Sequence, residues 1–251
     1  MKFKDFLLDV FIISCYILFW ELMVKGFKIP DRILPPPTAI LSAFLSTAHY
    51  VLVQSFSTVI VIVSGLVPAI IIGIFLGACI SEWKFVRKML LPLVSSSQVI
   101  PKTAIIPLFL AWHLGYSTTS KSIITFLISF YPVLLGTCLG FSRISDDFIF
   151  LFKSFGASRL QTLFRLKLPA SVPHIVTGIK AAALYSVIGA ITSEIFMGGQ
   201  GIGYVINFSS EKLNMEMTFV GLTIATIIGS LFFAGISIFE STFVKKRWGG
   251  S

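Results

Sequence analysis

The stretch from 154 to 169, SFGASRLQTLFRLKLP, is a basic segment in a chain that is otherwise mostly apolar. It contains Arg159, Arg165 and Lys167, and Gly156 lies near its start. A basic segment is unexpected in so apolar a chain. The composition and hydropathy of the flanking sequence indicate where it lies relative to a membrane.

The composition indicates a membrane protein. The chain has 251 residues, of which 55% are hydrophobic and 12% are charged, and its mean hydropathy is +0.92. A soluble domain averages about 25% charged residues, so this chain has too few polar residues to cover a soluble core. A membrane β-barrel is disfavoured, because its short strands alternate apolar and polar residues.

Six stretches are long and apolar enough to cross a membrane as helices. The first follows Lys2 and Lys4, and we interpret it as a retained helix because no small-residue cleavage site follows it. The third contains Pro92, Pro101 and Pro107, so we expect it to be kinked or broken. The predicted spans cover residues 6–24, 58–80, 90–112, 121–141, 174–197 and 217–243. The sequence therefore predicts an all-α integral membrane protein with one transmembrane domain over residues 1–251.

The distribution of lysine and arginine predicts the orientation, because these residues concentrate in cytoplasmic segments. With the N-terminus inside, most of the 20 basic residues fall on the cytoplasmic side. The net charge of +9 is then a topology signal, and a nucleic-acid partner is disfavoured because no soluble basic domain is present. The cytoplasmic residues are Lys2 and Lys4; Lys84, Arg87 and Lys88; Arg143, Lys153, Arg159, Arg165 and Lys167; and Lys245, Lys246 and Arg247.

The basic segment lies in the longest cytoplasmic loop and has the pattern of a short amphipathic helix. Leu160, Leu163 and Phe164 recur at helical spacing and share one face, while Arg159 and Arg165 take another. Two interpretations stay open from the residues alone. The helix rests on anionic lipid headgroups, or it docks a cytoplasmic partner.

We expect this loop to cover residues 142–173. Gly156 precedes the short helix, where it interrupts the helical course of the chain or lets a partner's backbone approach closely. Pro169 and Pro173 are expected to end the helix.

The spacing of this segment resembles the coupling loop of ATP-binding-cassette (ABC) importer permeases of the binding-protein-dependent type. The family pattern is E-A-A, three residues, Gly, nine residues, Ile, one residue, Leu-Pro. Here nine residues separate Gly156 from Leu166, which stands for the Ile, and Leu168 and Pro169 follow. Phe150–Phe152 occupy the E-A-A positions, so the family's glutamate is missing.

Three further stretches resemble the nitrate, sulfonate and taurine branch of that family and relatives that carry pyrimidine precursors of thiamine. They are ILPPPTAILSAF (33–44), IPKTAIIPLFLAWHLGYSTTSK (100–121) and SEIFMGGQGIGYVI (193–206). The resemblance implies the type I ABC importer permease fold in a bacterial inner membrane. It also implies a permease dimer, two ATPase subunits that bind ATP and Mg, and a soluble binding protein. The loop residues that it implies in ATPase coupling are Ser154, Phe155, Gly156, Ala157, Ser158, Arg159, Leu163, Leu168 and Pro169.

The chain is not expected to hydrolyse ATP or to hold a cofactor. It lacks the G-x-x-x-x-G-K-[ST] phosphate loop, and no glycine is followed by lysine anywhere. The sequence also shows no Ser/His/Asp arrangement, no paired carboxylates with catalytic partners and no metal-ligand spacing among the three cysteines. We therefore expect a non-catalytic subunit whose ATPase is a separate chain.

Charged residues within the predicted spans are candidates for the solute pathway, because a charge at the bilayer centre costs about 2.5–3.5 kcal/mol on insertion scales. Glu194 and Lys102 are such residues, and Gly199 and Gly201 follow Glu194 as a candidate gate or docking surface for the binding protein. The alternatives are local capping for Glu194 and structural pairing for Lys102. Lys180 is expected to extend its amine to the inner headgroups.

Two helical features complete the prediction. The patterns Gly73-x-x-x-Gly77 and Gly136-x-x-x-Gly140 favour close helix packing, within one subunit or between two. An amphipathic helix that begins at Thr38 is expected on the outer membrane surface.

The alternative function is a secondary transporter or a membrane-anchored interaction protein, for which an inverted repeat or a row of carboxylates is expected. The sequence leaves the transported solute open.

Overall fold

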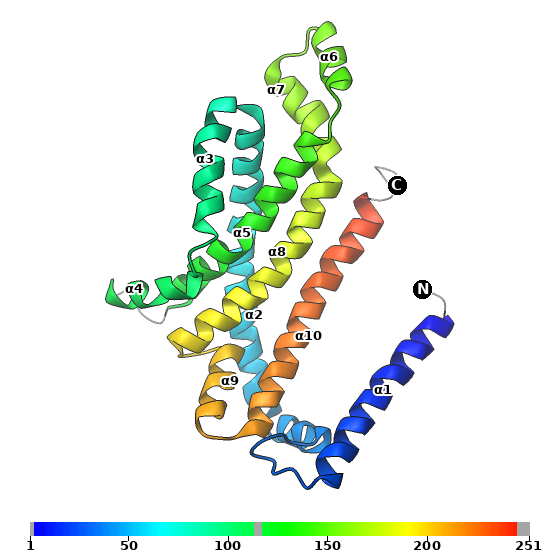
Figure 1. The fold of residues 1–251 in the computed structure, drawn as a ribbon, viewed down its shortest axis with the longest axis vertical. Helices are drawn as coiled ribbons and strands as arrows, with labels where there is room; N and C mark the ends of the chain where they lie inside the picture. Colours follow the sequence, from blue (N-terminus) through cyan, green and yellow to red (C-terminus); the bar gives the residue numbers. More distant parts are fainter. Residues whose placement is uncertain (1–2, 113–116, 245–251) are drawn as a thin grey trace.

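A computed structural model of the chain describes residues 3–112 and 117–244, which are helical almost throughout and contain no strand (Figure 1). The basic residues at 2 and 245–247 lie outside the described residues. The α-helices are α1 (Phe3–Gly26), α2 (Pro37–Glu82), α3 (Lys84–Ser97), α4 (Ile106–Ala111), α5 (Thr118–Ser142), α6 (Asp146–Ser154), α7 (Arg159–Thr162), α8 (Leu168–Met197), α9 (Ile202–Glu211) and α10 (Met215–Phe239). A 3₁₀ turn covers Lys102–Ile105, and π-helical turns cover Leu163–Lys167 and Glu240–Val244.

Four of the described helices are long and apolar enough to cross a membrane, which confirms the predicted all-α membrane class. They are Pro37–Glu82, Thr118–Ser142, the run Arg159–Met197 and Met215–Thr242. Lys84–Ser97 and Lys102–Phe109 form a fifth if the bent pair is one span. The predicted first span, 6–24, coincides with α1, but its described part is not among these candidates. The described residues thus support four or five of the six predicted spans.

The predicted break in the third span is confirmed. The two segments of the bent pair meet at 86°, next to Pro101, whose missing N–H prevents a continuous helix. The Nζ of Lys102 donates to the carbonyl oxygen of Ser97 at 2.7 Å and to Gln98 Oε1 at 3.2 Å. The Lys102 ammonium therefore lies at the C-terminal end of α3, where the partial negative charge of the helix end favours a cation.

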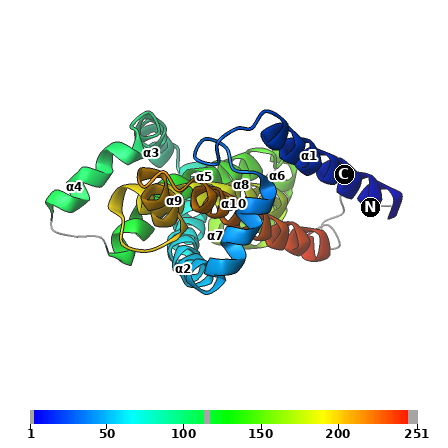
Figure 2. The ribbon, with the colours of Figure 1, turned by 90° about the horizontal axis from the view of Figure 1, so that it is seen from below.

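The helix predicted to begin at Thr38 is not a separate surface element. It is the start of α2, a single helix of 46 residues, or about 69 Å at 1.5 Å per residue. Its first turns lie across the lower end of the bundle before the helix rises through it (Figure 1, Figure 2). Residues 38–64 contain neither glycine nor proline, so nothing in the sequence ends the helix before the apolar span.

The core forms where α5 packs between α2 and α8. A Cβ atom added to Gly77 of α2 would lie 2.6 Å from the Cβ of Thr137 in α5. One added to Gly140 of α5 would lie 2.7 Å from the Cβ of Ser171 in α8. The prediction that both glycine patterns serve close helix packing is confirmed, and both do so within one chain.

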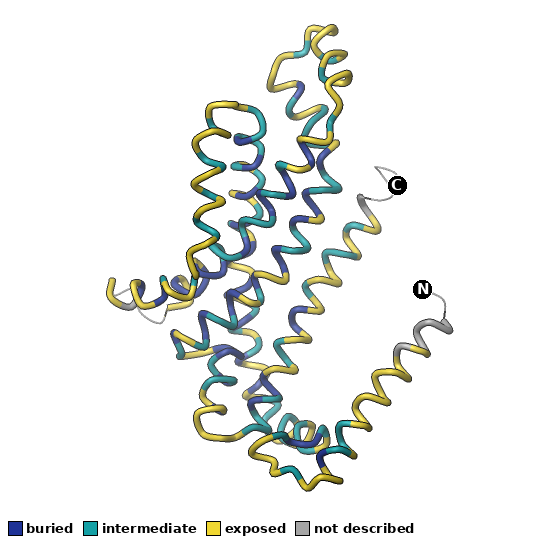
Figure 3. The backbone as a smooth tube through the Cα atoms, in the orientation of Figure 1, coloured by how far each residue is buried: buried dark blue, intermediate teal, exposed yellow. Residues whose placement is uncertain are grey.

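The bundle presents apolar surface on its flanks. Buried positions follow α2, α5 and α8, whereas α1 and α3 are exposed along most of their length (Figure 3). α1 lies on one side of the bundle and the bent pair of α3 and α4 on the other (Figure 1, Figure 2). The segment with α6 and α7 lies at one end, and α9 lies at the opposite end.

Candidate functional site: a helical loop and a polar cluster at opposite ends

The segment that links α5 to α8, which we call the α6–α7 loop (residues 143–167), stands beyond the bundle (Figure 1). Its second helix begins with a reciprocal capping box. The backbone N–H of Gln161 donates to Ser158 Oγ at 3.2 Å, and the backbone N–H of Ser158 donates to Gln161 Oε1 at 2.7 Å. This capping satisfies backbone donors that a helix start leaves free, so the loop has a defined shape.

Gly156 separates the two helices in a left-handed backbone conformation, with φ of +74°. Its N–H donates to the carbonyl of Lys153 at 2.9 Å, which ends α6. No atom lies within 4 Å of the position that a Cβ would take. The conformation therefore favours glycine, while the space around it is open.

The α6–α7 loop exposes large apolar side chains. Phe155 is 82% exposed, Leu160 65% and Phe164 62%, and the loop is mostly exposed along its length (Figure 3). Arg159 and Arg165 are also exposed. The loop thus presents apolar and basic side chains that no other described part of the chain covers.

The base of the loop is fixed to the bundle. Lys167 Nζ forms an ion pair with Glu82 Oε1 at the end of α2, at 2.5 Å. The expectation that Pro169 and Pro173 end the short helix is wrong, because one helical run extends from Arg159 to Met197. The π-helical turn directly before Pro169 accommodates its missing N–H, and α8 continues through Pro173.

The structure brings the predicted coupling residues together in this one segment. Ser154 ends α6, Phe155 to Ala157 form the link, and Ser158 is the N-cap of α7. Arg159 is the first residue of α7, Leu163 opens the π turn, and Leu168 and Pro169 start α8.

At the opposite end, residues 198–201 join α8 to α9, and we call them the glycine loop. Gly198, Gly199 and Gly201 have φ values of +69°, +86° and +113°. Lys121 Nζ of α5 donates to the carbonyls of Gly198 at 2.7 Å and of Gln200 at 2.8 Å. A buried amine therefore binds the side of the loop where α8 ends.

The start of α9 is bound by side chains of α2 and α8. Glu194 Oε2 accepts from the N–H of Gly203 at 2.8 Å and from Thr58 Oγ1 at 3.0 Å. Thr58 Oγ1 accepts from the N–H of Ile202 at 2.8 Å. Gln54 Oε1 accepts from the N–H of Gly201 at 2.7 Å. Gln54, Thr58, Lys121 and Glu194, which we call the polar cluster, are all buried.

The polar cluster contains only part of the predicted pathway set. Glu194 is 0% exposed, and its Oε1 has no hydrogen-bond partner among the described residues. Gly201 lies against that carboxylate, whereas Gly199 is exposed at the tip. Lys102 hydrogen-bonds at the end of α3 instead, and Lys180 pairs with Glu240. A pathway role for Glu194 and Lys102 stays a prediction.

Sequence reasoning missed Gln54, Thr58 and Lys121. Lys121 was the one signal in the sequence for this cluster, because a charge at the edge of a predicted span needs a polar partner. That partner lies at the end of α8, in the carbonyls of Gly198 and Gln200. Gln54 and Thr58 carried no such signal, because polar residues also occur on exposed helix faces.

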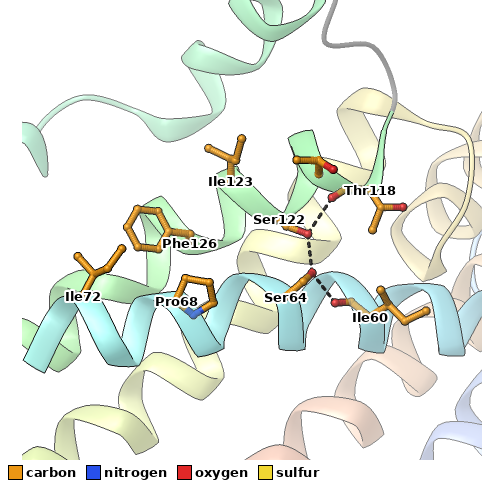
Figure 4. Close-up of a pocket in the computed structure, with 9 residues that line it drawn as sticks. Ile60, Ser64, Pro68, Ile72, Thr118, Ser122, Ile123 and Phe126 are labelled. Atoms are coloured by element: carbon orange, nitrogen blue, oxygen red, sulfur yellow. Dashed lines mark hydrogen bonds between the residues drawn. The ribbon is translucent and has the colours of Figure 1, made fainter.

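A shallow cavity of about 410 Å³ lies between α2 and α5, lined by apolar and hydroxyl side chains (Figure 4). Ser64 and Ser122 join its walls through a hydrogen bond of 2.6 Å between their hydroxyls. Their other hydrogen-bond partners are backbone carbonyls, of Ile60 and Val61 for Ser64 and of Thr118 for Ser122. The cavity lining contains no charged residue, so the described site favours no ionic ligand there.

Known proteins resemble this chain over most of its length. The formylaminopyrimidine transport permease protein ThiX of Halalkalibacterium halodurans is 29% identical over 91% of each chain. The taurine transport system permease protein TauC of Escherichia coli is 27% identical over 81% of this chain and 76% of its own. The nitrate import permease protein NrtB of Synechocystis is 27% identical over 78% and 70%.

The family match covers the end of α2, the helices from α3 to α10, the α6–α7 loop and the polar-cluster residues from α5 and α8. Residues 69–247 match the family described as binding-protein-dependent transport system inner membrane component. That range holds more than half of the chain and includes Gly156, Lys121 and Glu194. Together with the helical membrane fold, this match confirms the predicted type I ABC importer permease class, and the chain belongs to the family of binding-protein-dependent transport system inner membrane components.

Proposed function

We propose that this chain is the permease subunit of an ATP-driven importer and that its α6–α7 loop docks a separate ATPase. The exposed apolar surface of that loop is the observation that carries the proposal. Water-exposed Phe155, Leu160 and Phe164 lose their contact with water when a partner covers them, at roughly 25 cal/mol per Å² of apolar area. The related permeases of named transport systems support the same assignment.

The geometry of the loop suits a protein groove. Gly156 offers open space in which a partner backbone can approach. The capping box gives α7 its shape before any partner arrives, which reduces the ordering cost of binding. Lys167 and Glu82 connect the docked loop to α2, so force on the loop reaches the transmembrane bundle.

The complete importer would contain a second permease subunit, two ATPase subunits and a soluble binding protein. The ATPases would bind ATP and Mg, and this chain would be non-catalytic. We place it in a bacterial inner membrane with both termini in the cytoplasm. The α6–α7 loop and the basic turn between α2 and α3 lie at the same end of the fold (Figure 1), which is consistent with that orientation.

The cargo would be a small solute delivered by the binding protein. Relatives are named for formylaminopyrimidine, taurine and nitrate, which differ in charge and size. The pathway would lie between two permease subunits.

A matched pair of substitutions tests the docking proposal. Phe155 is 82% exposed on the α6–α7 loop, and Phe27 is 79% exposed at the opposite end. Phe155→Asp should reduce the copurified ATPase at least tenfold while the amount of permease in the membrane stays unchanged. Phe27→Asp should retain the ATPase. Full copurification with both variants would refute docking through this loop, and equal loss with both would show a general folding effect instead.

A further inference from the structure

The glycine loop lies between two buried charges of opposite sign. Lys121 binds the carbonyls of Gly198 and Gln200, where α8 ends. Glu194 binds the N–H of Gly203 in the first turn of α9. The C-terminal end of a helix carries partial negative charge and the N-terminal end carries partial positive charge. Each buried charge therefore faces the helix end that it complements.

We propose that Lys121 and Glu194 are positioning residues that, together with the α2 side chains, hold the glycine loop and α9 fixed on α2, α5 and α8, so that these segments move as one body during transport. The inference rests on the proposed function for its transport cycle. It assigns the glycine loop a rigid role at the mouth of the permease, in place of a gate that opens by bending.

The hydrogen bonds leave the junction little freedom. The N–H groups of three consecutive residues, Gly201 to Gly203, are each bound by a buried side chain. These side chains come from α2 and α8, and Lys121 adds two bonds from α5. Lifting the loop from α2 would break the bonds to the buried side chains of Gln54 and Thr58, and buried polar groups without partners are costly.

The glycines at 201 and 203 let the start of α9 pack closely against Glu194 of α8. A Cβ on Gly203 would lie 2.7 Å from the Cβ of Glu194, and a Cβ on Gly201 would collide with the Glu194 carboxylate. Real Cβ atoms essentially never lie that close to another atom. Because the space is filled, the glycines at 201 and 203 indicate tight packing here, and they are no sign of a loop that moves freely.

Mobility of a spin label measures the holding role directly. The label is attached at Gln200→Cys, an exposed position of the glycine loop, after the three native cysteines have been replaced by alanine. Lys121→Met should convert an immobilised nitroxide spectrum into a mobile one, and Lys121→Arg should restore immobilisation because it keeps donors for both carbonyls. Lys180→Met, which removes a lysine paired with Glu240 elsewhere, should leave the spectrum unchanged.

An unchanged spectrum in Lys121→Met would overturn the inference for Lys121. The same measurement on Glu194→Ala tests the second charge, with Glu194→Gln as the variant that keeps an acceptor for the N–H of Gly203. These spectra are recorded on the complete purified permease. They decide the holding role even where no ATPase copurifies, so failure of the proposed function and failure of this inference are distinguishable.

A reversible cross-link tests whether the junction stays closed during turnover. Ser57 Oγ of α2 lies 3.5 Å from Gln200 Oε1, so a short bis-methanethiosulfonate linker joins cysteines placed at these two positions. The readout is ATP hydrolysis by the reconstituted complex, with Mg-ATP as the only added ligand. The cross-linked complex should hydrolyse ATP within twofold of the reduced one. A tenfold loss that reductant restores would show that the loop must leave α2, and the inference would be wrong.

Discussion

Two glycines with left-handed backbones lie at opposite ends of the fold and should respond differently to the same substitution. Gly156 has φ of +74° and no atom within 4 Å of a built Cβ. Gly201 has φ of +113°, and its built Cβ collides with the Glu194 carboxylate. Alanine at each position therefore separates the cost of backbone strain from the cost of a steric clash.

The expected magnitudes follow from these two geometries. Alanine in a left-handed conformation costs about 1–2 kcal/mol, which is the whole expected effect of Gly156→Ala. Gly201→Ala adds overpacking in a filled site, typically another 1–3 kcal/mol. For a domain of this size, 1 kcal/mol lowers the melting temperature by about 2–4 °C. Gly201→Ala should therefore lower it by about 1.5 to 4 times as much as Gly156→Ala.

The assay is thermal unfolding of the two detergent-solubilised variants, together with the amount of copurified ATPase. Gly156→Ala should remain well folded, and the larger Gly156→Trp should also reach the membrane but lose ATPase because it fills the open space at the docking surface. Gly201→Ala that melts like the unchanged protein would refute the packing argument. Normal ATPase docking and transport by Gly156→Trp would refute the role given to the open space.

Three further substitutions test other contacts. Thr58→Val removes the hydroxyl that accepts from the N–H of Ile202 and donates to the Glu194 carboxylate, so it should lower the free energy of unfolding by about 1–3 kcal/mol. Thr58→Ser keeps the hydroxyl and should lower it much less. Equal losses would contradict the hydroxyl's role. Gly77→Leu should lower stability by about 1–3 kcal/mol or more through overpacking of α2 against α5, and a melting temperature equal to that of the unchanged protein would contradict the close approach. Lys167→Glu should weaken the coupling of the permease to the ATPase, and Glu82→Lys in the same chain should restore it. The interaction energy between the two positions in a double-mutant cycle should be about 0.5–3 kcal/mol. Additive losses would contradict the ion pair.

The sequence was sufficient for features that depend on local pattern. Long apolar runs predicted the spans, of which the described residues support four or five, and the three prolines of the third span predicted a kink or break, which is confirmed between α3 and α4. Glycine spacing predicted the close contacts of Gly77 and Gly140. Each of these signals comes from neighbouring residues or from one helical face, so no knowledge of the tertiary fold was required.

Features that depend on distant residues could not be predicted in the same way. Thr58 and Glu194 are 136 positions apart and share a hydrogen bond of 3.0 Å, and no periodicity connects them. The first turns of α2 look amphipathic and so predict a separate surface helix, although no helix breaker separates them from the span. Pro169 predicts a helix end, but the helical run continues through it after a π turn over Leu163–Lys167, and local sequence pattern does not indicate such a turn.

The α2 helix contacts both candidate regions and connects them. Glu82 at its end pairs with Lys167 at the base of the α6–α7 loop, and Thr58 holds the first turn of α9. The 24 residue steps from Thr58 to Glu82 cover about 36 Å at 1.5 Å per residue, slightly more than the roughly 30 Å hydrocarbon core of a bilayer. Because Gly77 brings α2 into close contact with α5, the two helices should resist bending between those points. A displacement of the docked loop would therefore be transmitted along α2 to its contact with α9.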